Sequence, residues 1–369
     1  MTPRAAARPV VVAPDKFKGT LSAPEAAGAI GRGLVRAGFS AIDLLPVADG
    51  GEGTMDALAT ALRARFVAAE AADPLGRPVS AAFALAEDGR LAILEAAQAS
   101  GLWRLAGFER DALGASTTGT GELIAAAIDA GAREVILGVG GTATTDGGRG
   151  ALEALGARFS KRRADLSEVR RRLRGVRLSV ACDVRNPLLG PAGAARIFGP
   201  QKGANAAQVE ELEARLREWA ALARRTVDRD PSEVQMAGAA GGLAGGLWAF
   251  AGAQLRPGAP LVLELVGFDA RAQQACMVVT GEGRLDDQTL GGKAVFEVAT
   301  RSRQAGVPCY VVPGEDALDA FGKRLLNIEA EGAGRGQGTP AERLEEAARR
   351  MGRRQAPYLA SARARTTAS

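Results

Sequence analysis

Short apolar runs alternate along this chain with longer alanine-rich stretches. The apolar runs include "PVVVAP" (9–14), "AIDLLPVA" (41–48), "EVILGVGG" (134–141) and "CMVVTG" (276–281). Runs of this kind predict buried strands, and the alanine-rich stretches between them predict helices. The first helix is expected to begin after Ser22, which can form a capping box with Glu25, and to end at Gly38. The alternation predicts an α/β protein with largely parallel sheets.

The pattern changes between Phe66 and Leu102. Polar and apolar residues alternate there, and the turn signal "DPLGRP" (73–78) interrupts them, which indicates antiparallel strands. We therefore predict a Rossmann/flavodoxin-like parallel-sheet domain, formed by residues 1–66 and 270–360. A second, mixed α/β domain is expected as an insertion at 67–269, and residues 361–369 are expected to be a disordered tail.

Carboxylates follow most of the predicted strands, usually within a glycine-containing bend. These acids are Asp15, Asp49, Glu52, Asp146, Asp183, Glu282, Asp286 and Asp287. In open α/β sheets ligands bind at the carboxyl ends of the parallel strands, so we expect these acids to gather there.

Lysines occupy the same class of position. They are Lys16 and Lys18 in "APDKFKGT", Lys202 in "FGPQKGA" and Lys293 at the predicted start of a helix. Glycine bends, helix N-termini, lysines and carboxylates together suit a polyphosphate and a divalent cation. Phosphoryl transfer is therefore the reaction class that these residues favour.

Composition narrows the chemistry further. The 369 residues contain no histidine, which excludes a Ser-His-Asp or Cys-His catalytic arrangement and any histidine metal ligand. The three cysteines, Cys182, Cys276 and Cys309, are widely spaced, as expected of reduced thiols in a cytoplasmic protein. No apolar run is long enough for a signal peptide or a spanning helix. The net charge of +5 comes from 47 basic and 42 acidic residues that are intermixed, so charge alone does not predict a nucleic-acid or membrane partner.

Two other functional classes remain open at this point. "GVGGTA" (138–143) matches the G-x-G-x-x-A fingerprint of dinucleotide-binding oxidoreductases, although no ribose-binding acid follows at the usual distance. The basic run at 161–177 could serve a sugar- or acid-binding regulator without turnover. Nucleic-acid binding by this run is not favoured, because aromatic stacking residues are absent. No Walker A motif is present, because neither Gly-Lys pair has the required spacing.

Eight blocks of sequence resemble the type I glycerate kinases and cover about residues 10–350 in order. They are "APDKFKGTLSA", "PVADGGEGT", "GTGELI", "GVGGTATTDGG", "CDVRNPLLG", "FGPQKGA", "GAAGGLAGGL" and "TGEGRLDDQTLGGK". The resemblance implies a two-domain kinase outside the P-loop class, with ATP and Mg²⁺ as cofactors. Its expected reaction is phosphorylation of D-glycerate at the 2-hydroxyl, with the 3-hydroxyl as the alternative. Neither nucleic acid nor membrane is an expected partner, and a homodimer is compatible with the family.

The resemblance also suggests roles for individual residues. Asp286 is expected to orient or deprotonate the substrate hydroxyl, and Lys18 and Lys202 to bind phosphates or the glycerate carboxylate. Asp183 and Glu282 are the expected metal ligands, with loop capping as the alternative for both. The remaining predicted substrate- and nucleotide-binding residues are Asp15, Asp49, Gly50, Gly51, Glu52, Gly140, Gly141, Thr142, Asp146, Asn186 and Lys293. For Asp49, Glu52 and Asp146 the sequence leaves open whether they bind metal or brace the glycine bends, and Asp287 is expected to be structural.

Overall fold

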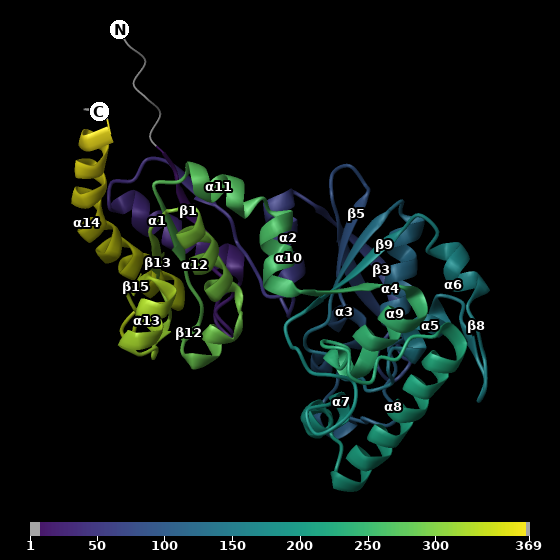
Figure 1. The fold of residues 1–369 in the computed structure, drawn as a ribbon. Coiled ribbons are helices and arrows are strands. Elements are labelled where there is room, and N and C mark those ends of the chain that lie inside the picture. Colours follow the sequence, from purple (N-terminus) through teal and green to yellow (C-terminus); the bar gives the residue numbers. More distant parts are fainter. Residues whose placement is uncertain (1–7, 367–369) are drawn as a thin grey trace. The chain divides into compact units, whose positions relative to one another are not determined.

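The computed structural model describes residues 8–366. Contacts between Cα atoms divide the chain into two compact units. The first unit comprises the residues up to Asp49, Asp56–Ala61 and the residues from Ala259 onward, and the second comprises Gly50–Met55 and Leu62–Gly258. Each unit contains its own sheet, as Figure 1 shows. The predicted limits of independently folding domains, 1–66 plus 270–360 and 67–269, stay a prediction.

The first unit is built on a five-stranded, all-parallel sheet in the order β15-β13-β11-β1-β2. In chain order these strands stand 2-1-3-4-5, the flavodoxin-like arrangement, so the predicted fold class is confirmed for this unit. Its strands are β1 (Val10–Val12), β2 (Ile42–Leu44), β11 (Met277–Thr280), β13 (Cys309–Val311) and β15 (Ile328–Ala330), with the short pair β12 (Arg284–Leu285) and β14 (Glu315–Asp316). The chain reverses direction across the sheet between β1 and β11, and this switch point is where such folds bind ligands.

Helices cover both faces of this sheet. They are α1 (Ala23–Arg36), α11 (Phe268–Gln274), α12 (Ala294–Gln304), α13 (Ala320–Leu326) and α14 (Pro340–Thr366), while α2 (Thr54–Leu62) and α10 (Gly258–Leu265) begin in the second unit and continue in the first. Helices α1 and α14 pack together over the face that carries Val10, Val12 and Val279 (Figure 1). The capping box of α1 is confirmed, because the Ser22 hydroxyl accepts from the Glu25 amide and the Glu25 side chain accepts from the Ser22 amide.

The second unit has a six-stranded mixed sheet in the order β10-β9-β6-β5-β4-β3. Strands β5 (Leu91–Glu95), β6 (Glu134–Gly138), β9 (Arg177–Cys182) and β10 (Gln254–Pro257) are parallel. The outer strands β4 (Pro78–Leu85) and β3 (Arg65–Ala72) are antiparallel, as the alternating pattern predicts. A two-stranded pair, β7 (Arg158–Phe159) and β8 (Ala164–Asp165), lies apart from this sheet.

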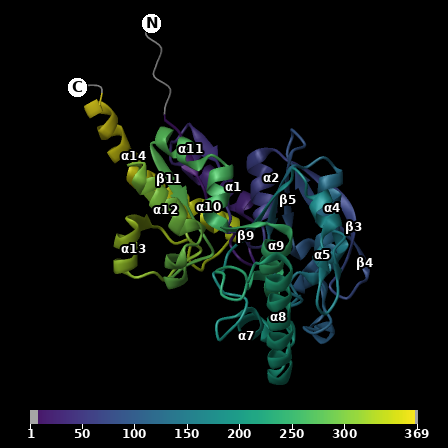
Figure 2. The same cartoon turned by 45° about the vertical axis from the view of Figure 1, so that its right-hand side comes forward.

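The helices of the second unit follow the sequence pattern in most places. They are α3 (Ala97–Ser100), α4 (Thr118–Asp129), α5 (Arg149–Ala154), α6 (Ser167–Arg172), α7 (Ala194–Phe198), α8 (Ala206–Val227) and α9 (Leu243–Ala251). Figure 2 shows the long helix α8 beside α9. Among residues 8–366 no helix is both long and apolar enough to cross a membrane. Helix α14 extends to Thr366, into the segment predicted as a disordered tail, and residues 367–369 lie outside the described part.

Candidate active site

Two buried carboxylates lie side by side at the switch point of the first unit. Asp15 follows β1 and Glu282 follows β11, and the Asp15 amide donates a hydrogen bond of 2.9 Å to the carbonyl of Gly281. The two residues are only 7% and 8% exposed. The parallel pairing of β1 with β11 therefore brings these two predicted site residues together, although 267 positions separate them in the sequence.

Burial changes the protonation of both acids. The pKa of Asp15 rises to about 7, first because of burial and then because the Asp49 carboxylate is near, while Lys16 acts in the opposite direction. The pKa of Glu282 also rises to about 7, again mainly through burial, and its hydrogen bond from Thr289 and the charge of Lys293 lower it in part. A carboxylate pair of this kind gains stability when a proton or a cation is bound beside it.

Thr289 connects Glu282 to the loop that follows it. The Thr289 hydroxyl donates to Glu282 Oε1 at 2.6 Å and accepts from the Asp286 amide at 3.2 Å. Thr289 is fully buried, so its hydroxyl fixes the orientation of the Glu282 carboxylate. Thr289 is not among the residues predicted from the sequence, although it lies three positions after Asp286, which is the spacing of a helix cap.

Asp286, the expected catalytic acid, has local structural contacts in this loop. Its Oδ1 accepts from the Gln288 amide at 3.0 Å, which caps the 3₁₀ turn Asp287–Gly291, and its Oδ2 lies 3.3 Å from Arg284 Nε. Its side chain is nevertheless 29% exposed, so a ligand can reach it. Asp287 is exposed at the start of the same turn.

The lysines of the first unit differ in their surroundings. Lys16 Nζ lies 4.0 Å from Asp49 Oδ1. Lys18 is exposed in the tight turn between Phe17 and Leu21. Lys293 precedes α12, and its Nζ donates to Gln288 Oε1 at 3.3 Å. Lys16 and Lys293 therefore lie beside the carboxylates of the switch point, while Lys18 is presented to solvent.

Two glycine bends of the second unit meet backbone to backbone. A Cβ atom on Gly50 would lie 2.9 Å from the Cα of Gly258, and one on Gly140 would lie 2.7 Å from the Cα of Gly51. Neither position has room for a side chain, and Gly50 has a φ of 93°. The bend at 50–53, which carries Glu52, thus packs on the bend that carries Gly141 and the buried Thr142. The tight approach leaves backbone groups, and not side chains, to line this region.

Glu95 ends β5 and braces the first of these bends. It is buried, and its Oε1 accepts from the Met55 amide at 2.8 Å, in the first turn of α2. Glu95 is not among the predicted site residues. A signal for it is nevertheless present in the sequence, because Glu95 is a carboxylate at the end of an apolar run, like the predicted acids.

Asp146 braces the second bend through hydrogen bonds to both of its carboxylate oxygens. Its Oδ2 accepts from the Thr117 amide and hydroxyl, each at 2.8 Å, and from the Gly150 amide at 3.1 Å. Its Oδ1 accepts from the Gly148 amide at 2.9 Å. Both carboxylate oxygens are thus engaged by the start of α5, which favours the structural interpretation over metal binding.

Replacing Asp146 with alanine is expected to lower the free energy of unfolding by about 3 kcal/mol, since buried amides at the start of α5 lose a charged acceptor. Urea unfolding measures this change. The matched control is Asp165→Ala, which removes an exposed aspartate at the end of β8 that accepts from the Ser167 amide and should cost less than about 1 kcal/mol. Unchanged stability of the Asp146 variant together with a higher Mg²⁺ requirement would instead identify Asp146 as a metal ligand.

The other predicted residues of the second unit are spread along the carboxyl ends of its strands. Asp183 follows β9 and is exposed. The side-chain amide of Asn186 donates to the Ala192 carbonyl at 2.8 Å, so it fixes the loop after β9. Lys202 is buried, and its Nζ donates to the Thr144 carbonyl at 2.5 Å. Among residues 8–366, no group of three or more Asp, Glu, Cys or His side chains is placed to hold a metal ion.

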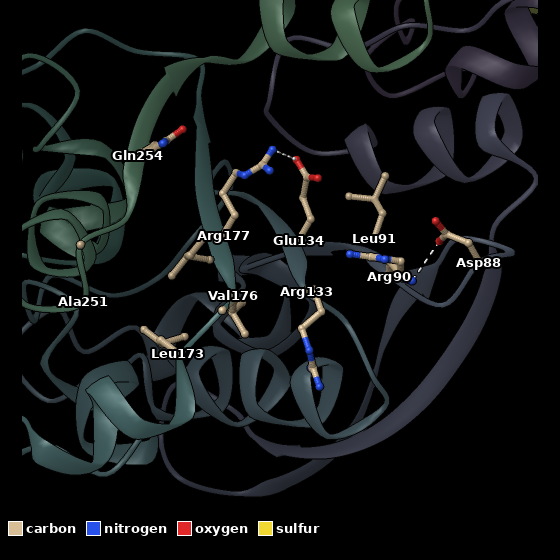
Figure 3. A pocket seen from close by; sticks show the side chains of 13 residues that line it. Asp88, Arg90, Leu91, Arg133, Glu134, Leu173, Val176, Arg177, Ala251 and Gln254 are labelled. Carbon is tan, nitrogen blue, oxygen red and sulfur yellow. Dashed lines mark hydrogen bonds and ion pairs between the residues drawn. The ribbon is translucent and has the colours of Figure 1, made fainter.

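A pocket of about 560 Å³ opens at the opposite edge of the second sheet. It is lined by the first residues of four parallel strands, which are Leu91, Glu134, Arg177 and Gln254, together with neighbouring residues. Figure 3 shows Arg177 and Glu134 directed at one another. Arg177 Nη1 lies 3.2 Å from Glu134 Oε1. No predicted site residue lines this pocket, and the amino ends of parallel strands are the edge that α/β folds do not use for ligands.

The two alternative functions lack the structural context they require. A dinucleotide fingerprint needs its glycine turn to open a helix, whereas α5 begins only at Arg149, well after "GVGGTA". Several arginines of the basic run are engaged in ion pairs: Arg171 with Glu168, Arg172 with Asp129 and Arg177 with Glu134. The geometry therefore favours a solvated surface at the basic run, on which several arginines form ion pairs with neighbouring carboxylates.

Comparison with known proteins gives a consistent result. The model of the glycerate kinase family matches residues 10–353. A glycerate kinase of Bacillus subtilis is 42% identical over 339 residues, covering 87% of this chain and 88% of the relative. A glycerate 2-kinase of Escherichia coli K12 is 39% identical over 323 residues, covering 83% of this chain and 84% of the relative. A crystal structure from Salmonella typhimurium LT2, described as a candidate glycerate kinase 2, has 37% identity and a TM-score of 0.85, covering 97% of this chain and all of that one.

Proposed function

The chain belongs to the glycerate kinase family, and on that premise we propose that it transfers the γ-phosphoryl group of ATP to the 2-hydroxyl of D-glycerate. The observation that carries the proposal is the family match over residues 10–353, which includes every predicted site residue. The 2-hydroxyl is chosen because the Escherichia coli relative is a glycerate 2-kinase. A cytoplasmic location is part of the proposal, in line with three cysteines that form no disulfide within the described residues.

The chemistry asks for positioning and for charge stabilisation more than for a strong base. Phosphoryl transfer passes through a loose transition state, and an aspartate that accepts the hydroxyl proton is sufficient. We assign this role to Asp286, whose side chain is partly exposed beside the switch point. The hydrogen bond from the Gln288 amide and the ion pair with Arg284 hold its carboxylate in one orientation. A group held in this way loses little entropy when the substrate binds.

Glu282 is the carboxylate of the first unit that fits a magnesium ion. Its Oε1 is oriented by the Thr289 hydroxyl, and burial raises the pKa of the carboxyl group, so a bound cation would stabilise the charged form. Mg²⁺ that arrives with a nucleotide needs only one or two protein carboxylates, because phosphate oxygens and water complete its shell. Asp15 is the adjacent second carboxylate. The bound ion would neutralise charge that develops on the transferred phosphoryl group.

The remaining assignments are proposals of the same kind. Asp183 is the candidate metal ligand of the second unit. The glycine bends with Gly50, Gly51, Gly140 and Gly141 offer backbone amides to phosphate oxygens. Lys18 and Lys293 supply positive charge for phosphates, and Asp49, Glu52, Thr142 and Asn186 are kept as binding candidates.

The purified protein is expected to release ADP in a manner that depends on D-glycerate and Mg²⁺. A coupled ADP assay with glycerate, glycolate, lactate and tartronate should show a preference for glycerate. An assay coupled through enolase, without phosphoglycerate mutase, detects 2-phosphoglycerate directly. Activity that appears only after mutase is added would assign the 3-hydroxyl, and an absence of glycerate-dependent ADP release would remove the proposed activity.

A further inference from the structure

Lys202 carries a buried ammonium group with unused hydrogen-bond donors. It ends the 3₁₀ turn Pro200–Lys202 and is 2% exposed. Among residues 8–366, Nζ donates one hydrogen bond, to the Thr144 carbonyl at 2.5 Å, although an ammonium group has three donors. Burial lowers the pKa of Lys202 to about 7, and the charge of Asp146 offsets only part of this effect. A buried lysine in such surroundings needs an anion to become fully charged.

Two hydroxyl groups without a partner belong to the same loop. Thr144 and Thr145 are 0% and 3% exposed, and neither hydroxyl has a hydrogen-bond partner among residues 8–366. Nearby hydroxyls are satisfied: Thr117 donates to Asp146, and Ser100 bonds to Thr120. Buried polar groups are normally paired, so two consecutive exceptions next to Lys202 require an explanation.

One alanine in the turn beside this loop has a strained backbone conformation. Ala240, Gly241 and Gly242 all adopt positive φ angles, of 54°, 65° and 90°. A Cβ on Gly241 would lie only 2.0 Å from the Thr144 carbonyl oxygen, so the two backbone segments are in close contact. A left-handed alanine is unfavourable and persists where the surroundings enforce it, often at ligand sites. The turn at 240–242 therefore packs directly against the loop that carries Thr144 and Thr145.

We propose that Lys202, Thr144 and Thr145 form a subsite for the carboxylate group of a small organic acid. The inference rests on the proposed function, in which that group is the carboxylate of D-glycerate. The two unused ammonium donors and the two hydroxyls match the lone-pair sites of one carboxylate. A phosphate of ATP fits less well, because Lys202 supplies a single positive charge and Asp146 is the neighbouring charged group.

The subsite has a defined pH dependence. The carboxylate binds to the protonated form of Lys202, and the free protein loses that form as the pH rises through about 7. The affinity for glycerate should therefore be constant well below pH 7 and fall toward tenfold per pH unit above it. Binding near pH 8 should take up a proton, which calorimetry in buffers of different ionisation enthalpy detects. Asp146 is the charged group that acts on Lys202, and its charge raises the pKa of the lysine in part.

The test is binding of D-glycerate, measured by calorimetry without ATP, in Thr144→Val, Thr145→Val and Lys202→Met. Valine keeps the shape of threonine and removes the hydroxyl. Each variant is expected to raise the Kd for glycerate at least about tenfold and to leave the Kd for ADP within about twofold. Lys202→Met should also abolish proton uptake. The matched control is Thr226→Val in α8, which removes the third buried hydroxyl without a partner in the described chain and should change neither Kd.

Three outcomes would overturn the subsite. Unchanged glycerate binding in all three variants would show that the hydroxyls and the lysine only pack, and a selective loss of ADP binding would assign the loop to phosphate. A parent protein that binds none of glycerate, lactate, glycolate and tartronate has no such subsite. Failure of the proposed function is distinguishable, since a parent that binds one of these acids through Lys202 but releases no ADP keeps the subsite and loses the kinase assignment.

Discussion

Replacing Asp286 with asparagine is expected to lower kcat by about two to four orders of magnitude, with little change in the KM for ATP. The chain has no histidine, so the hydroxyl proton of glycerate must pass to a carboxylate or to the phosphate itself. Asparagine caps a helical turn as well as aspartate does, and it keeps the acceptor for the Gln288 amide. The substitution therefore removes the charge and leaves the turn in place. Steady-state kinetics at saturating Mg²⁺ measure the effect.

The neighbouring Asp287→Asn is the matched control, because Asp287 is exposed at the start of the same turn. It should retain turnover within about a factor of three. Near-normal turnover of Asp286→Asn would show that Asp286 has only a structural role. That role consists of accepting the hydrogen bond from the Gln288 amide and forming the ion pair with Arg284. Thermal unfolding of both variants checks that neither change acts through stability.

Replacing Glu282 with glutamine is expected to weaken binding of the divalent ion by about 100-fold and to lower kcat at fixed Mg²⁺ by a similar factor. The amide oxygen can still accept from the Thr289 hydroxyl, so the loop keeps its bond while the charge is lost. Binding of Mn²⁺ in the presence of ADP, followed by electron paramagnetic resonance, reports the ion directly and does not depend on turnover. Higher Mg²⁺ should restore part of the activity.

Two comparisons separate this role from a structural one. Glu297→Gln removes a carboxylate in the first turn of α12 that is not among the predicted metal ligands, and it should leave Mn²⁺ affinity unchanged. Thr289→Val keeps the charge of Glu282 and removes the hydroxyl that orients it, so a weaker loss of about tenfold is expected, which Thr289→Ser should reverse. Parent-like Mn²⁺ affinity in Glu282→Gln would contradict the assignment.

Local sequence signals were sufficient for most of the main elements and for the fold class. The apolar runs at 9–14 and 276–281 became β1 and β11, and Ser22 with Glu25 starts α1 as their spacing predicts. These features depend on neighbours within a few residues and on hydrophobic periodicity, both of which can be read from the chain. The rule that parallel strands gather their carboxyl ends at one edge then placed Asp15 beside Glu282.

Tertiary structure alone decided what each polar side chain faces. Asp146 and Glu282 are similar acids in glycine-rich bends, yet the first is held by the amides at the start of α5, while the second is buried with a pKa near 7. Lys18 is exposed and Lys202 is buried, and the sequence around them does not distinguish the two. Thr289 and Glu95 were missed because their contacts form only after the chain has folded. Desolvation and hydrogen bonding depend on residues distant in sequence, whereas strands, caps and turns are encoded by residues nearby.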